Sequence, residues 1–132
     1  FMRANVGDPY KFGAEIAESE ADPKAGDCSE YTEQAYKRAG LEYPDGSNFQ
    51  RAFCRGRRVK EPKPGDPFFF DPNEDGIGHT GLYVGGGMAI EARGRPINLV
   101  QMIDKTRIEA HPRFAGWFRH PEFAYPMAER AG

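Results

Sequence analysis

The spacing of apolar residues divides the chain into a helical first half and a strand-rich second half. From Cys28 onward, apolar side chains recur at helical spacing, and Gly40 follows in the position where glycine commonly ends a helix. The recurring positions are Tyr31, Ala35, Tyr36 and Ala39. This pattern predicts an amphipathic helix over residues 28–39.

A second helix is expected to start at Ser47, whose hydroxyl can cap its first turn. It should run through Cys54 or Arg55 before Gly56 ends it. Its expected buried face consists of Phe49, Ala52 and Phe53. Cys54 lies next to that face, and we interpret it as a small, partly buried side chain in preference to a functional thiol.

Beyond Val59 the helical spacing gives way to proline, glycine and β-forming residues. Strands are expected at residues 68–71, 79–84, 88–93, 97–102 and 115–119, followed by a poorly specified tail over 121–132. The glycines at 85–87 provide a tight turn between the second strand and the third. Helices followed by antiparallel strands define the α+β class, so the predicted fold has N-terminal helices packed on a C-terminal antiparallel sheet of about five strands.

Length and charge limit what the chain can be. Its 132 residues suffice for one domain with a hydrophobic core, which we expect to span residues 1–132, with the core over about 5–120. A formal net charge of −2, from 18 basic and 20 acidic residues, disfavours nucleic acid as a partner. No apolar run approaches a membrane span of about 20 residues. We expect a monomer or part of a larger multidomain protein.

Cys28 is the first candidate for chemistry. Two cysteines are too few for a disulfide scaffold and are not spaced as a zinc site, so a free thiol is expected. The predicted helix places Cys28 in its first turn, where unpaired backbone N–H groups and the positive end of the helix dipole favour thiolate over thiol. Cys28 is therefore a candidate nucleophile that needs a base.

His79 is the favoured base among the three histidines. It begins a predicted strand, which fixes the imidazole, and the flanking Gly78 and Gly81 leave room for another backbone or a substrate. His111 and His120 each precede a proline and are weaker candidates. By count alone a histidine is more often a surface or satisfied core residue, so the setting of His79 decides the choice.

Glu91 is the candidate group that orients this base. If the strands at 79–84 and 88–93 pair across the glycine turn, Glu91 returns to a position near His79. There its carboxylate could accept a hydrogen bond from the imidazole and stabilise imidazolium. The alternative, equally weighted, is a solvated carboxylate that pairs with Arg93 or Arg95.

Four short motifs follow one another along the chain: PYKFG from Pro9, DCS from Asp27, PGDPFFF from Pro64 and HTGLYVG from His79. In this order and spacing, over about Gly7 to Arg119, they resemble the NlpC/p-sixty family of papain-like cell-wall cysteine peptidases. Glu30 departs from the family pattern, because a glycine usually follows the serine. The PYKFG motif also lacks the family's tryptophan and second glycine. We therefore expect the substrate preference of this chain to differ from that of the family.

The resemblance implies a papain-like fold and roles for six residues. Cys28 corresponds to the nucleophile and His79 to the base. The family's third polar residue lies twelve positions after the base and falls on Glu91, which strand pairing indicates independently. The residues that correspond to oxyanion and substrate contacts are Tyr10, Asp27 and Ser29.

The same resemblance implies a reaction. A Cys28–His79–Glu91 triad would hydrolyse an amide bond in peptidoglycan stem peptides, between γ-D-glutamate and a diamino acid, through an acyl-enzyme and with no cofactor or metal. The expected partner is the peptidoglycan peptide, and the expected location is the bacterial cell wall, extracellular or periplasmic. Three alternatives stay open: a CHAP-like amidase or endopeptidase of the wall, a non-catalytic wall-binding or structural module such as a phage tail component, and a toxin that uses the same hydrolysis.

Overall fold

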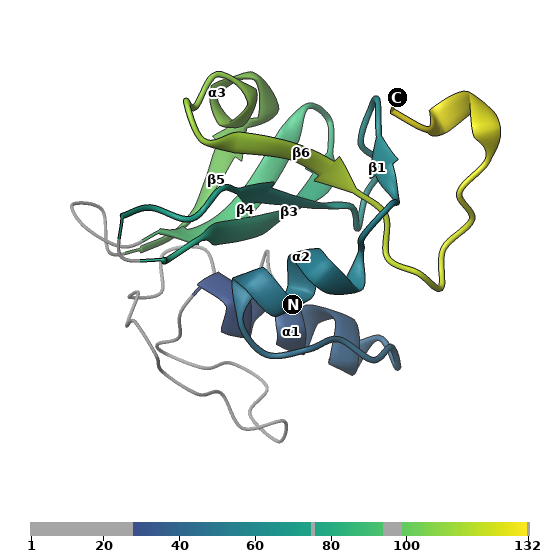
Figure 1. The fold of residues 1–132 in the computed structure, drawn as a ribbon, viewed down its shortest axis with the longest axis horizontal. Coiled ribbons are helices and arrows are strands. Elements are labelled where there is room, and N and C mark those ends of the chain that lie inside the picture. Colours follow the sequence, from purple (N-terminus) through teal and green to yellow (C-terminus); the bar gives the residue numbers. More distant parts are fainter. Residues whose placement is uncertain (1–27, 75, 94–98, 132) are drawn as a thin grey trace.

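The computed structural model describes residues 28–74, 76–93 and 99–131. Two helices, α1 and α2, cover one face of an antiparallel sheet, and a short helix, α3, covers the other (Figure 1). The elements in chain order are α1 (Cys28–Arg38), α2 (Ser47–Phe53), β1 (Arg58–Val59), β2 (Pro67–Phe70), β3 (His79–Gly85), β4 (Met88–Arg93), β5 (Leu99–Asp104), α3 (Lys105–Glu109), β6 (Phe114–Phe118) and the 3-10 helix η2 (Met127–Glu129). The predicted α+β class is confirmed.

The sheet has six strands in the order β1-β6-β2-β3-β4-β5, and each neighbouring pair is antiparallel. The central strand β2 is buried on both faces, which explains its unbroken apolar run. Phe69 packs in the core beneath α1, while Phe68 and Phe70 pack in the core beneath α3. The extra strand, β1, has two residues and is too short for an alternating pattern to reveal.

Helix α1 confirms the predicted start at Cys28, but α2 buries a face that differs from the predicted one. The expected core residues of α2 are exposed, with 72% of Phe49 and 39% of Phe53 accessible, and Ala52 is also exposed. Gln50 is buried in their place because its amide joins the two helices. The Thr32 hydroxyl donates to Gln50 Oε1 at 2.7 Å, and Gln50 Nε2 donates to the carbonyl of Ser29 at 2.9 Å.

The expected cap of α2 is also wrong. Gly46 occupies the N-cap with a φ of 88°, a left-handed conformation that favours glycine, and Ser47 is the first helical residue. No side-chain hydrogen bond caps this helix. Packing through Gln50, rather than a local cap, therefore determines where α2 lies.

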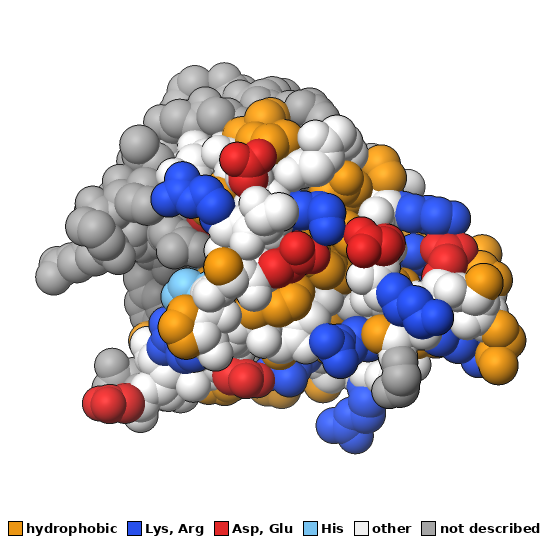
Figure 2. Space-filling view, turned by 90° about the horizontal axis from the view of Figure 1, so that it is seen from above, with side chains coloured by type: hydrophobic (Ala, Val, Ile, Leu, Met, Phe, Trp, Pro, Cys, Tyr) orange, Lys and Arg blue, Asp and Glu red, His pale blue; other side chains and the backbone are white. Residues whose placement is uncertain are grey.

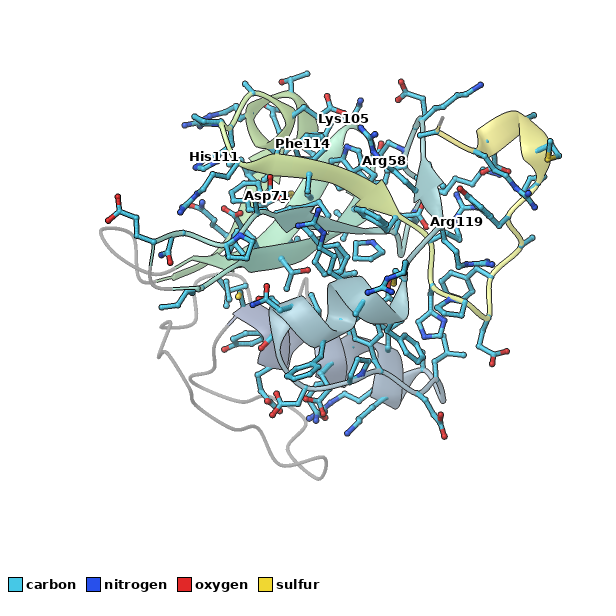
Figure 3. All side chains as sticks on the ribbon, in the orientation of Figure 1. Arg58, Asp71, Lys105, His111, Phe114 and Arg119 are labelled. Carbon is cyan, nitrogen blue, oxygen red and sulfur yellow. The ribbon has the colours of Figure 1, made fainter. Side chains whose placement is uncertain are left out.

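The C-terminal segment is not the unspecified tail that the sequence pattern suggests. Arg119 directly follows β6 (Figure 3) and is buried. It binds both carboxylate oxygens of Asp66, with Nε–Oδ1 at 2.6 Å and Nη2–Oδ2 at 2.9 Å. The same guanidinium binds Glu129 in η2 at 3.0 Å. Arg130 then forms a bridge with Val59 of β1. An ion pair between distant residues leaves no periodic signal, so the prediction missed this anchor.

The strands that carry the candidate site match their predicted positions closely. β4 has the predicted bounds, and β3 extends one turn residue further, to Gly85. β5 continues past the expected end at Met102 as far as Asp104, while residues 97 and 98 lie outside the described residues. The sequence pattern does not indicate α3. No helix among the described residues is long and apolar enough to cross a membrane. Acidic and basic side chains are interspersed on the face that Figure 2 shows.

Candidate active site

Cys28 lies where helix α1 meets the sheet. It is the first residue of α1, its thiol is not in a disulfide, and only 7% of the residue is exposed. The thiol belongs to the core cluster that α1 forms with Phe69 and Leu82 of the sheet. The N–H groups of a first helical turn have no partner within the helix, and the positive end of the helix dipole lies there.

His79 lies within reach of this thiol. It is the first residue of β3, and its ring packs against those of Phe68 and Phe70, with centroid distances of 5.7 and 5.2 Å. A side-chain hydrogen bond joins the imidazole to Cys28. Nε2 lies 2.8 Å from Glu91 Oε1. The two aromatic neighbours and two polar partners hold the ring in one orientation between the thiol and the carboxylate.

Glu91 is wholly buried in β4, so the alternative of a solvated carboxylate is wrong. Oε1 faces His79, and Oε2 accepts a hydrogen bond from Gln101 Nε2 at 3.0 Å. Gln101 lies in β5, directly opposite Glu91 in the strand register. The sequence prediction does not include Gln101. The sequence does contain one sign of it, a single polar side chain within the apolar run LVQMI.

The pKa of His79 reflects these surroundings. Burial disfavours the charged imidazolium, but the hydrogen bonds to Cys28 and Glu91 outweigh it and raise the pKa of His79 to about 9. The imidazole is therefore charged at neutral pH. A thiolate beside an imidazolium is the arrangement that cysteine hydrolases use for attack on a carbonyl carbon.

The glycines beside His79 allow close packing around the site. A Cβ on Gly81 would lie 2.5 Å from the Phe68 ring and 2.6 Å from the carbonyl oxygen of Ile90. Neither distance is possible for a real side chain. Gly81 thus lets the neighbouring strand and the aromatic ring approach, in agreement with the expected approach of another backbone.

The other predicted contact residues are only partly described. Ser29 is buried in the first turn of α1, and its carbonyl accepts the hydrogen bond from Gln50. Tyr10 and Asp27 lie outside the described residues.

The remaining histidines and the second cysteine have structural surroundings. His120 is fully buried, accepts the N–H of Glu122 at Nδ1 and donates from Nε2 to the carbonyl of Glu42 at 2.8 Å. The ring of His111 stacks on Phe70 with a centroid distance of 4.2 Å. Burial raises the pKa of the Cys54 thiol to about 12, so it remains protonated at neutral pH. Cys54 is thus fully buried, where the sequence pattern predicts a partly buried side chain.

Three carboxylates are the group of described residues best placed to hold a metal. Oxygen atoms of Glu30, Glu33 and Asp45 lie within 4.8 Å of one another. Glu33 is also in an ion pair with Lys37 at 2.7 Å, one helical turn away. Glu30 and Glu33 are buried and Asp45 is exposed, and the chemistry of Cys28 and His79 gives the cluster no part.

Comparisons with known proteins place the chain in one family. A model of the family described as "NlpC/P60 family" matches residues 7–111. The chain is 31% identical over 97 residues to a probable endopeptidase p60 of Listeria grayi, covering 74% of this chain and 18% of that protein. It is 37% identical over 81 residues to the peptidoglycan DL-endopeptidase CwlO of Bacillus licheniformis, covering 60% and 18%. The chain therefore spans less than a fifth of these relatives.

Solved structures show the same fold. The peptidoglycan hydrolase RipB of Mycobacterium tuberculosis superposes with a TM-score of 0.70 at 25% identity, covering 92% of this chain and 62% of that one. The P60 domain of the antigen MAP1204 from M. avium subspecies paratuberculosis has a TM-score of 0.69 at 23% identity, with 92% and 90% covered. The second likeness concerns the fold alone.

Proposed function

The chain belongs to the NlpC/P60 family, and we propose that it is a cysteine peptidase that hydrolyses an amide bond in peptidoglycan stem peptides. The observation that carries the proposal is the juxtaposition of Cys28, His79 and Glu91. They come from α1, β3 and β4, and hydrogen bonds link thiol to imidazole and imidazole to carboxylate. A nucleophile, a base and a group that orients the base are the parts that covalent acyl transfer requires.

In the first step the Cys28 thiolate attacks the carbonyl carbon of the stem-peptide amide. The developing oxyanion faces the backbone N–H of Cys28 at the start of α1, where an unpaired donor stabilises negative charge. The C–N bond then breaks, and the His79 imidazolium donates its proton to the leaving amine. The products of this step are a free amine and a thioester on Cys28.

In the second step, neutral His79 takes a proton from water, and the resulting hydroxide attacks the thioester carbonyl. The C–S bond breaks, which releases a carboxylic acid and restores the thiolate–imidazolium pair. Glu91 stabilises the charged imidazole in both steps and keeps its ring in one orientation. Each proton that leaves His79 is thus returned within one cycle, and neither step requires a cofactor.

The bond we propose joins γ-D-glutamate to the diamino acid of the stem peptide. It links a D centre to an L centre, and the relative CwlO is named a DL-endopeptidase. We further propose that Tyr10 assists at the oxyanion and that Asp27 and Ser29 contact the stem peptide. A carboxylate at Asp27 suits recognition of a free amine by charge. The proposed place of action is the cell wall.

The test is the release of soluble peptides from purified peptidoglycan. The unmodified chain and Cys54→Ala should release them, while Cys28→Ala should release none and keep its fold by circular dichroism. Cys54 is the matched control because it is the other free, buried cysteine. Equal release by the Cys28→Ala variant would exclude the proposed nucleophile. No release by any of the three would favour a non-catalytic wall-binding module.

A further inference from the structure

Gln101 extends the line of polar contacts behind the proposed catalytic pair. Its Nε2 donates to Glu91 Oε2 at 3.0 Å, while Glu91 Oε1 lies 2.8 Å from His79 Nε2. The register of β4 and β5 places Gln101 directly across from Glu91. Hydrogen bonds thus run from β5 through β4 and β3 to the thiol at the start of α1.

The chemistry of a buried carboxylate explains why this contact matters. Glu91 is wholly buried, and an ionised carboxylate in that setting is stable only while hydrogen bonds or charges compensate its lost hydration. His79 occupies one oxygen, and Gln101 occupies the other. A primary amide does not titrate, so it donates to Glu91 at every pH, whereas the imidazole donates only in the appropriate protonation state.

The neighbouring residues make Gln101 the distinctive group in its strand. β5 reads LVQMID, with an apolar residue on each side of the glutamine. Val100 is buried in the core beneath α1, and Met102 pairs with Ile90 in the register, so the side chains on either side of Gln101 point to the opposite face of the sheet. The one amide in this strand therefore lies directly opposite the buried carboxylate of Glu91, to which it donates a hydrogen bond.

We propose that Gln101 is a positioning residue for the reaction, which holds Glu91 ionised and turned toward His79. This inference rests on the proposed function but concerns a residue that touches neither the substrate nor the reacting atoms. It acts through Glu91 alone. In the described residues, the titratable groups that act on the His79 ring are Cys28 from α1 and Glu91 from β4; the neighbouring side chains from β2 are the phenyl rings of Phe68 and Phe70.

Gln101→Met removes the amide and keeps the length of the side chain. Losing a hydrogen bond to a buried carboxylate disfavours its charged form, so the pKa of Glu91 should rise by about 1–2 units. Carbon-13 NMR of the side-chain carboxyl measures this directly, with Glu91→Gln used to assign the signal. The acidic limb of the pH profile of kcat/KM should move upward by a similar amount. Met102→Leu, on the opposite face of the same strand, is the matched control and should change neither.

A structural role alone would lower stability without moving either titration. An unchanged pKa of Glu91 in a folded Gln101→Met variant would overturn the inference. If that variant fails to fold, the isosteric Gln101→Glu replaces it. Its carboxyl donates only while protonated, so activity should fall increasingly as pH rises, and a pH profile equal to that of the unmodified chain would overturn the inference. The NMR titration needs no hydrolysis, so it gives its answer about Gln101 even if the proposed function fails.

Discussion

His79 and Glu91 are diagonal neighbours across two antiparallel strands, with Nε2 of the imidazole 2.8 Å from Oε1 of the carboxylate. The residue directly opposite Glu91 is Gly81, two positions after His79 on the same face of β3. Long side chains reach such diagonal partners. The Phe68 ring, which also contacts His79, packs where a side chain at Gly81 would lie, so the packing beside this pair depends on a glycine.

Replacing the carboxylate should change the pH dependence of the reaction. In Glu91→Gln the negative charge is lost, so the pKa of His79 should fall from about 9. Activity requires imidazolium, so the alkaline limb of kcat/KM against pH should move to lower pH. We expect kcat/KM at neutral pH to drop by about 10- to 100-fold, because general acid–base catalysis by His79 is weakened but not abolished.

The control for this change is Glu122→Gln, an exposed carboxylate in the C-terminal segment. It should retain the activity and the alkaline limb of the unmodified chain. If Glu91→Gln gives the same pH profile as this control, Glu91 has no part in setting the charge of His79.

The two thiols should react at very different rates with iodoacetamide. At pH 7 Cys54 should be nearly inert, because burial raises its pKa to about 12 and none of it is accessible. Cys28 has the imidazole as a proton acceptor and should be alkylated first. Peptide mapping by mass spectrometry after short exposure measures both rates. His79→Gln should slow the alkylation of Cys28 without affecting Cys54, whereas equal rates for the two cysteines would be inconsistent with an activated thiol at Cys28.

The Arg119–Asp66 pair should be important for stability. Both side chains are buried, and Arg119→Met leaves the carboxylate of Asp66 without its charged partner. Breaking one side of a buried pair costs about 3–5 kcal/mol in the free energy of unfolding. Urea denaturation measures this loss in the free energy of unfolding. Arg55→Met, at an exposed position, is the control and should change the free energy of unfolding by less than about 0.5 kcal/mol. A loss no larger than that of the control would show that the C-terminal segment is not anchored through this pair.

The parts of the fold set by local spacing were predictable from the sequence. The start of α1 at Cys28 follows from helical spacing, and the pairing of β3 with β4 follows from their β-forming residues and the glycines at 85–87. The pairing of β3 with β4 places Glu91 near His79. The candidate pair of base and carboxylate was therefore predictable by strand register, and the resemblance of motifs led to the same residue.

Features set by contacts between distant residues were not predictable in the same way. The apolar residues of α2 suggested a buried face, yet the helix packs through Gln50, whose partners lie on α1. Asp66 and Arg119 are far apart in the chain and belong to no periodic pattern. Gln101 pairs with Glu91 only once the register of β5 is known. In each case the polar side chain contacts a residue that only the tertiary fold brings close.

The most direct measurement of the central claim is the product mass spectrum of purified peptidoglycan after digestion. The account predicts that the unmodified chain releases one fragment that ends in γ-D-glutamate and a second that begins with the free amine of the diamino acid, and that Cys28→Ala releases neither. Cleavage at the amide between the glycan and the stem peptide, or the same fragments from Cys28→Ala, would contradict it.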